Sequence, residues 1–201
     1  NIMCNTKYDK KLIKKTVKKF KKRELNIRDI NIFLDIDNTL ALFSQKGGDA
    51  IACELAQEDG FFEDLPIFHC VEDTLMDLTR LGANIWILSA YPLRPNHEDM
   101  HSARTEKDKW IDRYIPFIPK EHRLLVPVGT NKAEIIDSVC DRKTAIFIDD
   151  YGKNIIHAYE AGIVGIKKTY SGKKRPCPQV RDFYDIFKVL KKLHVHITEE
   201  R

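Results

Sequence analysis

The stretch Asn31–Leu40 reads N-I-F-L-D-I-D-N-T-L and decides the fold. Its apolar start, with branched and aromatic side chains, is typical of a strand buried in a parallel sheet. Asp35 and Asp37 are expected just beyond the carboxyl end of this strand, the edge at which open α/β sheets bind ligands. The alternative is a plain helix-capping turn, which Asp, Asn and Thr favour and which Asn38 and Thr39 would suit.

Two carboxylates in this position suit phosphoryl transfer. Asp35 can attack a phosphorus atom and carry the phosphoryl group, while Asp37 protonates the leaving oxygen and later activates water. Because both anions would lie beside a phosphate dianion, a hard cation is needed to offset the repulsion, and Mg²⁺ prefers such oxygen ligands.

Further apolar segments alternate with helical patterns along the chain. Strands are expected over 84–88, 124–128, 144–148 and 163–167, and helices over 71–81, 104–115, 132–139, 153–161 and about 180–193, with a frayed tail over 194–201. This alternation predicts an α/β, Rossmann-like fold whose mostly parallel sheet of about five strands is flanked by helices.

Polar side chains follow the later strands as well. Ser89 ends one, Lys132 follows another, and Asp149 and Asp150 end a third. Hydroxyl and backbone N–H groups bind phosphate oxygens. A lysine in the first turn of a helix is disfavoured by the helix dipole, so Lys132 indicates an anion in front of it, and adjacent carboxylates indicate a metal or cation. A parallel sheet would gather all of these groups beside Asp35, which favours a site over a capping turn.

The chain is divided into a basic amphipathic helix within residues 1–29 and a domain over 30–201 that carries a small cap at about 41–70. Three cap aromatics, Phe43, Phe61 and Phe62, either stack on a flat substrate group or close the cap's own core. The residues alone do not decide between these interpretations.

Residues 1–30 hold eleven Lys or Arg and three Asp or Glu, whereas the remainder holds 23 and 27, within a formal net charge of +4. A helix over 8–25 would place Leu12, Ile13, Val17 and Phe20 on one face. Such a helix either contacts nucleic acid or an anionic surface, or packs its apolar stripe with a merely solvated basic face. The second interpretation is favoured, since a charge run alone is weak support for binding.

The five cysteines are odd in number and scattered, so neither a disulfide framework nor a thiolate zinc site is expected. His97 and His101 lack a third metal ligand and are interpreted as solvated loop residues. No apolar run approaches the roughly 20 residues of a membrane helix, and no charged-then-apolar leader opens the chain. A cytoplasmic protein without a membrane partner is expected.

D-I-D-N-T-L, L-S-A, Lys132 at a helix start and I-D-D resemble the four-motif pattern of the haloacid dehalogenase superfamily of phosphohydrolases. G-F-F-E-D-L-P, E-K-D-K-W-I-D-R-Y and I-D-D-Y-G-K-N-I are similar to segments of the 5'(3')-deoxyribonucleotidases and their bacterial relatives. The resemblance runs from about Phe33 to Ile166. It implies a Rossmann-like core with a cap, dependence on Mg²⁺, and hydrolysis of a nucleoside monophosphate.

The resemblance also implies roles by position. Asp35 would be the nucleophile, and Asp37 the acid and base that also offers its backbone carbonyl to the metal. Ser89 and Lys132 would bind the phosphate, and Ala90 stands in the same turn where those nucleotidases often have a second hydroxyl.

Asp149 and Asp150 would complete the metal site in this pattern, and Phe61 or Phe62 would stack on the base. The cap is shorter than in the mammalian enzymes and has fewer aromatics, so it encloses less substrate.

The sequence therefore predicts a Mg²⁺-dependent phosphomonoesterase that acts on a 5'-nucleotide, with a small-molecule phosphate ester as its partner. One alternative is a phosphatase for sugar phosphates or nucleic-acid ends. Another is a non-catalytic module that recruits nucleic acid or a partner through the basic arm, although nucleic acid is the less favoured partner. The oligomeric state stays open, with a homodimer as one arrangement.

Overall fold

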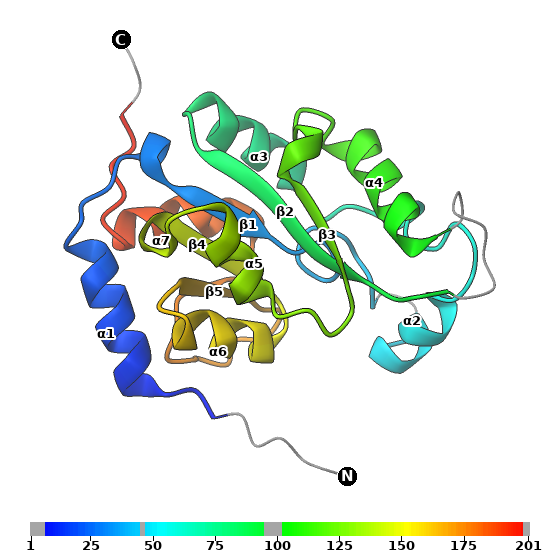
Figure 1. Cartoon of the computed structure of the whole chain (residues 1–201), viewed down its shortest axis with the longest axis horizontal. Coiled ribbons are helices and arrows are strands. Elements are labelled where there is room, and N and C mark those ends of the chain that lie inside the picture. Colours follow the sequence, from blue (N-terminus) through cyan, green and yellow to red (C-terminus); the bar gives the residue numbers. More distant parts are fainter. Residues whose placement is uncertain (1–6, 45–46, 95–101, 199–201) are drawn as a thin grey trace.

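A parallel sheet forms the centre of the computed structural model, which describes residues 7–44, 47–94 and 102–198 (Figure 1). The sheet has six strands in the order β3-β2-β1-β4-β5-β6, and all of these neighbours pair in parallel. The strands are β1 (Asn31–Leu34), β2 (Asn84–Tyr91), β3 (Arg123–Pro127), β4 (Ala145–Asp149), β5 (Val164–Lys168) and β6 (Gln179–Val180). The order reverses between β1 and β4, which is the switch point where ligands of such sheets bind.

Helices cover both faces of this sheet, as expected for crossover connections. They are α1 (Lys10–Lys21), α2 (Asp49–Leu55), α3 (Val71–Arg80), α4 (Ala103–Tyr114), α5 (Lys132–Val139), α6 (Gly152–Glu160) and α7 (Ile186–Lys192). Side chains alternate along β1, so that Ile32 and Leu34 join the core under α3, α4 and α7 whereas Phe33 joins the core under α5 and α6. The Rossmann-like α/β architecture predicted from the sequence is confirmed.

The end of the sheet differs from the prediction. A sixth strand, β6, is present although about five were expected, and it takes Val180, which was assigned to the last helix. A strand of two residues in a proline-containing segment has no alternation that a sequence pattern can reveal. The last helix, α7, begins only at Ile186. The helical pattern of 180–193 predicts Phe187 on the inner face, but this side chain is only partly buried.

The C-terminal segment is not frayed up to His196. The His196 N–H donates to the Leu25 carbonyl at 2.9 Å, the Ile27 N–H donates to the His196 carbonyl at 2.8 Å, and Val195 is buried. This pairing with the segment before β1 satisfies backbone groups that a frayed end would leave to water.

Helix α1 packs on the body through its apolar stripe, as the favoured interpretation of the N-terminal segment expected. Asp9 caps the helix by accepting from the N–H groups of Lys11 and Leu12, and Ile13 and Phe20 are buried on its inner side. The stripe contacts α6 and β5.

Cys53, Cys70, Cys140 and Cys177 are free thiols. His97 and His101 lie outside the described residues. Within 7–44, 47–94 and 102–198, no helix combines the length and the apolar character needed to cross a membrane.

Candidate active site

Asp35 and Asp149 lie side by side because their strands are neighbours in register. Leu34 of β1 pairs with Ile148 of β4, so the residues that follow these two meet at the carboxyl edge of the sheet. The Asp35 N–H donates to the Ile148 carbonyl at 3.1 Å, which continues the ladder by one bond. Both carboxylates are buried at the switch point of the sheet.

Lys132 joins these two carboxylates from the start of α5. Its Nζ lies 2.9 Å from Asp35 Oδ1 and 2.9 Å from Asp149 Oδ2, and 5 % of the side chain is exposed. Burial lowers the pKa of Lys132, but the charges of Asp35 and Asp149 outweigh it, so the net pKa is raised and the ammonium form is held. The anion predicted in front of Lys132 includes these carboxylates of the protein itself.

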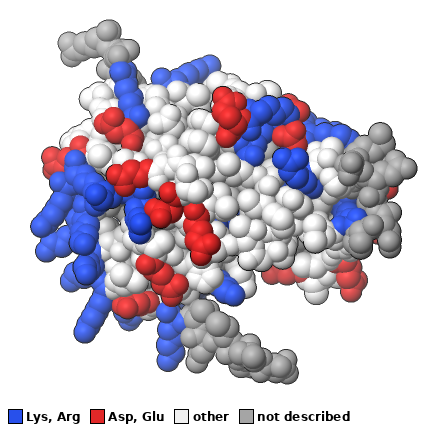
Figure 2. Space-filling view, in the orientation of Figure 1, with Lys and Arg blue, Asp and Glu red and all other residues white. Residues whose placement is uncertain are grey.

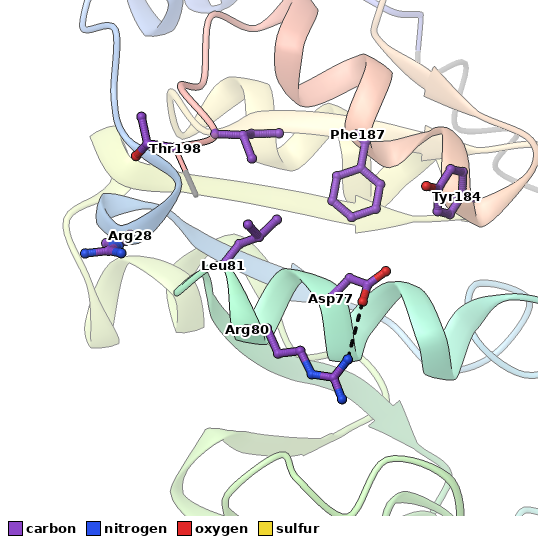
Figure 3. Close-up of a pocket in the computed structure, with 8 residues that line it drawn as sticks. Arg28, Asp77, Arg80, Leu81, Tyr184, Phe187 and Thr198 are labelled. Carbon is purple, nitrogen blue, oxygen red and sulfur yellow. Dashed lines mark ion pairs between the residues drawn. The ribbon is translucent and has the colours of Figure 1, made fainter. Parts of the chain in front are cut away.

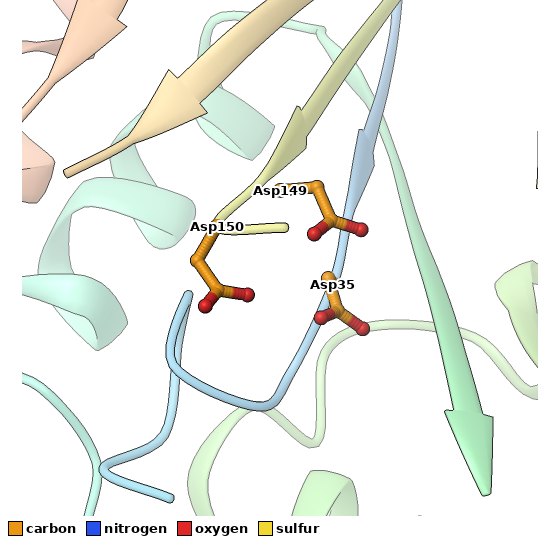
Figure 4. A group of neighbouring side chains, drawn as sticks. All are labelled: Asp35, Asp149 and Asp150. Carbon is orange, nitrogen blue, oxygen red and sulfur yellow. The ribbon is translucent and has the colours of Figure 1, made fainter. Parts of the chain in front are cut away.

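Asp35, Asp149 and Asp150 form an acidic cluster (Figure 4), in which one oxygen from each lies within 4.8 Å of the others. Asp149 already accepts from Lys132, from Asn154 Nδ2 at 2.8 Å and from the Tyr151 N–H at 2.7 Å. The carboxylate of Asp150 has no such donor among the described side chains. Burial, and then the charges of Asp35 and Asp149, raise the pKa of Asp150 to about 8.

This cluster fits a hard divalent cation. Lys132 is ion-paired with two of these carboxylates, and the third, Asp150, is influenced by the charge of Lys167 without forming an ion pair with it. The cluster therefore carries more negative than paired positive charge, and Asp150 is the least compensated member. The donor set consists of oxygen atoms, which Mg²⁺ prefers. Asp149 is engaged by its hydrogen bonds, whereas Asp35 and Asp150 have oxygen atoms to offer.

Asp37 is held by a lysine from a different helix. Lys107 of α4 is fully buried, and its Nζ lies 2.6 Å from Asp37 Oδ2 and 3.0 Å from Ser89 Oγ. Asp37 Oδ1 is buried without a hydrogen-bond partner in the described part of the chain. Burial raises the pKa of Asp37, while Lys107 acts in the opposite direction.

The segment after Asp37 forms a turn at Asn38, as the helix-capping alternative for this stretch also expects. Asn38 adopts φ +55°, a conformation that Asn tolerates better than most residues. Its side chain donates to Ser44 Oγ at 2.8 Å and accepts from the Ser44 N–H at 3.1 Å. Asn38 thus shapes the loop, while the two aspartates before it point into the site rather than cap a helix.

The phosphate-binding segment differs slightly from its predicted position. Strand β2 continues through Ser89 and Ala90, because both pair with β3, so these residues lie in the strand rather than after it. Ser89 is fully buried and its hydroxyl contacts Lys107. Ala90 lines the pocket at Asp35.

A pocket of about 310 Å³ opens over this edge of the sheet, a size at the lower end of small-molecule sites. Its lining brings together Asp35, Asp37, Ala90, Val128, Gly129, Thr130, Asn131, Lys132, Tyr151, Lys153, Asn154 and His157.

A second hollow, of about 650 Å³, lies between α3 and α7 near Arg28, at the amino end of β1 (Figure 3). Because it lies at the opposite end of that strand, it is separate from the acidic cluster.

The three cap aromatics pack on one another. Ring centroids lie 5.6 Å apart for Phe43 and Phe61, 6.2 Å for Phe43 and Phe62, and 5.1 Å for Phe61 and Phe62. Phe62 is 2 % exposed, with Lys107 Nζ 4.6 Å from its ring centroid, so its ring is closed to a substrate. Phe43 and Phe61 line a separate cavity of about 320 Å³ within the cap and not the pocket at Asp35. The interpretation as a core of the cap fits all three positions better than substrate stacking.

The sequence did not reveal that α4 contacts both the cap, through Glu106, and the carboxylate of Asp37, through Lys107. The sequence indicates Lys107 only as a candidate for phosphate contact, together with Arg104 and Lys109, the other basic groups of the helix predicted over 104–115. Its neighbour Glu106 forms a buried ion pair with Arg94, with Nη1 and Oε1 2.7 Å apart. A signal was available, since Lys107 occupies the same helical face as the buried Trp110, where a lysine needs an anionic partner.

Comparisons with solved structures identify the fold. A hydrolase of the haloacid dehalogenase superfamily from Ehrlichia chaffeensis has a TM-score of 0.57 and 15% identity, over 84% of this chain and 98% of that one. A dehalogenase has a TM-score of 0.57 and 12% identity, over 80% and 96% of the two chains. D,D-heptose 1,7-bisphosphate phosphatase from Burkholderia thailandensis has a TM-score of 0.53 and 10% identity, over 80% and 98%.

No family model and no curated protein matches the sequence. At the identities found among the solved structures, the likeness establishes a fold of the haloacid dehalogenase type. That fold is shared by a dehalogenase and a phosphatase, so the chemistry has to be argued from the site itself.

Proposed function

We propose that this chain is a Mg²⁺-dependent phosphomonoesterase that acts on nucleoside 5'-monophosphates through an aspartyl-phosphate at Asp35. The observation that carries the proposal is the meeting of Asp35, Asp37 and Lys132 in one pocket at the switch point of the sheet. Structures with the same fold include a bisphosphate phosphatase, which supports the reaction class. The nucleotide part of the proposal rests on the motifs that resemble deoxyribonucleotidases.

The hydrogen bonds assign the first step to particular atoms. Lys132 occupies Oδ1 of Asp35, which leaves Oδ2 to attack the phosphorus. The new bond joins Asp35 to phosphorus, and the ester P–O bond breaks. Asp37, whose carboxyl is oriented by Lys107 at Oδ2, gives a proton to the leaving oxygen.

The second step reverses the role of Asp37. As a carboxylate it takes a proton from water, the water oxygen bonds to phosphorus, and the bond to Asp35 breaks to release inorganic phosphate. Lys132 stays beside Asp35 throughout and offsets the charge that returns to its carboxylate.

Asp35, Asp150 and the backbone carbonyl of Asp37 are the groups that would hold Mg²⁺. When bound, the ion would offset the negative charge of the phosphoryl oxygens. Asp149 acts through Lys132, which it orients by the contact at 2.9 Å.

Hydrolysis of a carbon–halogen bond is the competing chemistry on this fold. A halide leaves without a proton, whereas an alcohol leaving group needs a donor, and Asp37 is placed as such a donor. A panel of nucleoside monophosphates, sugar phosphates and 2-haloacids, with and without Mg²⁺, tests the proposal. We expect phosphate release from 5'-nucleotides with Mg²⁺; halide release alone, or no phosphate from any ester, would overturn the proposal.

Mg²⁺ is expected to stabilise the wild-type protein and to stabilise Asp150→Asn far less. At a hundredfold excess over its Kd, the ion should contribute about 2.7 kcal/mol, which raises Tm by roughly 5–10 °C. Without the ion, Asp150→Asn should melt above wild type at neutral pH, because the raised pKa means that Asp150 must take up a proton on folding, and asparagine avoids that cost. Thermal melts with Mg²⁺ and with a chelator measure both effects.

Asp137→Asn is the matched control, because Asp137 is an exposed acid paired with Arg142 at 2.9 Å. It should respond to Mg²⁺ as wild type does. An equal Mg²⁺ response in Asp150→Asn would remove Asp150 from the metal site.

Lys107→Met is expected to lower kcat by about 10- to 100-fold, since Asp37 loses the group that orients its carboxylate. Lys109→Met, two residues on, removes a cation that is 45% exposed and pairs only with Glu63 within the described chain. It should leave kcat within a factor of about two. Steady-state kinetics on a nucleoside monophosphate distinguish the variants, and similar losses in both would contradict the role of Lys107.

A further inference from the structure

Helix α1 and its surroundings carry a strongly basic face. Exposed basic side chains cover the outer side of the helix; they are Lys10, Lys11, Lys14, Lys15, Lys18, Lys19, Lys22 and Arg23. None of them makes an ion pair with an acid in 7–44, 47–94 or 102–198. Figure 2 shows the basic atoms gathered over α1 on the side of the molecule where this helix lies in Figure 1.

Folding alone does not account for this charge. The inner stripe with Ile13 and Phe20 is what packs on α6 and β5. Like charges one turn apart destabilise a helix, and mixed charges would solvate the outer side equally well. A helix that keeps only positive charges on its outer side is suited to an anionic partner.

A second basic segment extends this face towards the catalytic edge. Lys173, Lys174 and Arg175 follow β5, and the Arg175 guanidinium lies 5.8 Å from the ring centroid of Tyr8, just before α1. The Tyr8 hydroxyl in turn packs against Gly152, the first residue of α6: it lies 3.1 Å from the point that a Cβ would occupy if this residue were not glycine. Since α6 directly follows Asp149 and Asp150, the basic face begins close to the acidic cluster and continues along α1.

Two exposed aromatic side chains lie at that end of the face. Tyr151 is 59% exposed, lines the pocket at Asp35 and is the ring on which a base can stack. Tyr170 is 49% exposed, but its ring already stacks on Phe68, with centroids 5.6 Å apart, and its hydroxyl donates to the Asn38 carbonyl. A basic track combined with exposed aromatic rings is the arrangement that binds single-stranded nucleic acids, whose bases stack while their phosphates meet cations. A membrane surface suits the helix less well, because its apolar side is already buried in the protein.

We propose that the basic face, Lys10–Arg23 together with Lys173–Arg175, binds the phosphate backbone of a single-stranded nucleic acid whose terminal phosphate reaches Asp35. This inference rests on the proposed phosphomonoesterase function and extends its substrate from a free nucleoside 5'-monophosphate to the same 5'-phosphate at the end of a strand. Helix α1, at about 1.5 Å per residue, is about 18 Å long, enough to accompany several nucleotides.

The test measures binding of the full chain to a labelled single-stranded oligonucleotide without a terminal phosphate, by fluorescence anisotropy across salt concentrations. Lys11→Gln, Lys14→Gln and Lys18→Gln are combined in one variant, and glutamine keeps the helix propensity. We expect its Kd to rise at least about tenfold at 50 mM salt, and the slope of log affinity against log salt to become shallower by about two.

The control combines Lys188→Gln, Lys191→Gln and Lys192→Gln on α7, which removes the same charge from a helix on the other face of the sheet. It should bind as wild type does. Equal losses in both variants, absence of binding by wild type, or a preference for anionic vesicles over the oligonucleotide would overturn the inference. Because this probe has no phosphate to release, a failure of catalysis shows up separately, in the panel of phosphate esters.

Discussion

Asp35→Asn is expected to lower the release of phosphate from a nucleoside monophosphate by at least about 10⁴-fold, because the amide cannot form the bond to phosphorus. The fold should persist, since Asn has the same size and its backbone N–H still donates to the Ile148 carbonyl. Wild-type protein quenched with acid during turnover of a radiolabelled ester should carry label that hydroxylamine removes. The variant should carry none.

The matched control is Asp29→Asn, which changes an exposed acid just before the amino end of β1. Its turnover should equal that of wild type, because Asp29 lies at the other end of the strand from the pocket. If Asp35→Asn keeps full activity while folded, attack by Asp35 is ruled out and direct attack by water becomes the mechanism to test.

The meeting of polar groups at the carboxyl edge of the sheet was predictable because each group is encoded locally. An apolar strand followed by a polar residue is visible in a few consecutive letters, and parallel pairing then brings the strand ends together without further information. Asp35, Lys132 and Asp149 meet for this reason, at contacts of 2.9 Å that no single segment specifies.

The contacts that α4 makes with Asp37 and with the cap could not be predicted in this way. Lys107 lies 70 residues from Asp37, and Glu106 lies 46 residues from Gly60, whose N–H it accepts. Such contacts depend on how the cap folds back on the helix, and the pattern of α4 alone only shows that a charged residue shares the buried face.

The cap aromatics illustrate a related limit. A run such as Phe61 and Phe62 indicates burial or stacking, but the partner of each ring is set by its three-dimensional neighbours. Lys107 Nζ and the Arg94 guanidinium lie 4.6 Å and 5.5 Å from the ring centroid of Phe62, so two cations from a distant part of the sequence decide the role of this ring.

Glu106→Gln is expected to cost about 3–5 kcal/mol of the free energy of unfolding, which lowers Tm by roughly 10 °C. Both side chains of the Arg94–Glu106 pair are fully buried, so the variant removes a carboxylate from beside a buried guanidinium charge. Glu106 also accepts from the N–H groups of Gly60 and Phe62, at 2.7 Å and 3.1 Å, and so holds the cap on α4. Thermal and denaturant unfolding measure the loss.

Two further variants separate the causes of that loss. Glu63→Gln breaks an exposed pair with Lys109, 3.2 Å long, and should change stability by no more than about 0.5 kcal/mol. Adding Arg94→Met to Glu106→Gln removes the buried guanidinium charge as well, so the double variant should be more stable than Glu106→Gln alone. If the double variant is no more stable than Glu106→Gln, the lost free energy of unfolding comes from the weaker hydrogen bonds that residue 106 then accepts from the two cap N–H groups. In that case the ion pair contributes little beyond holding the side chain of residue 106 in place.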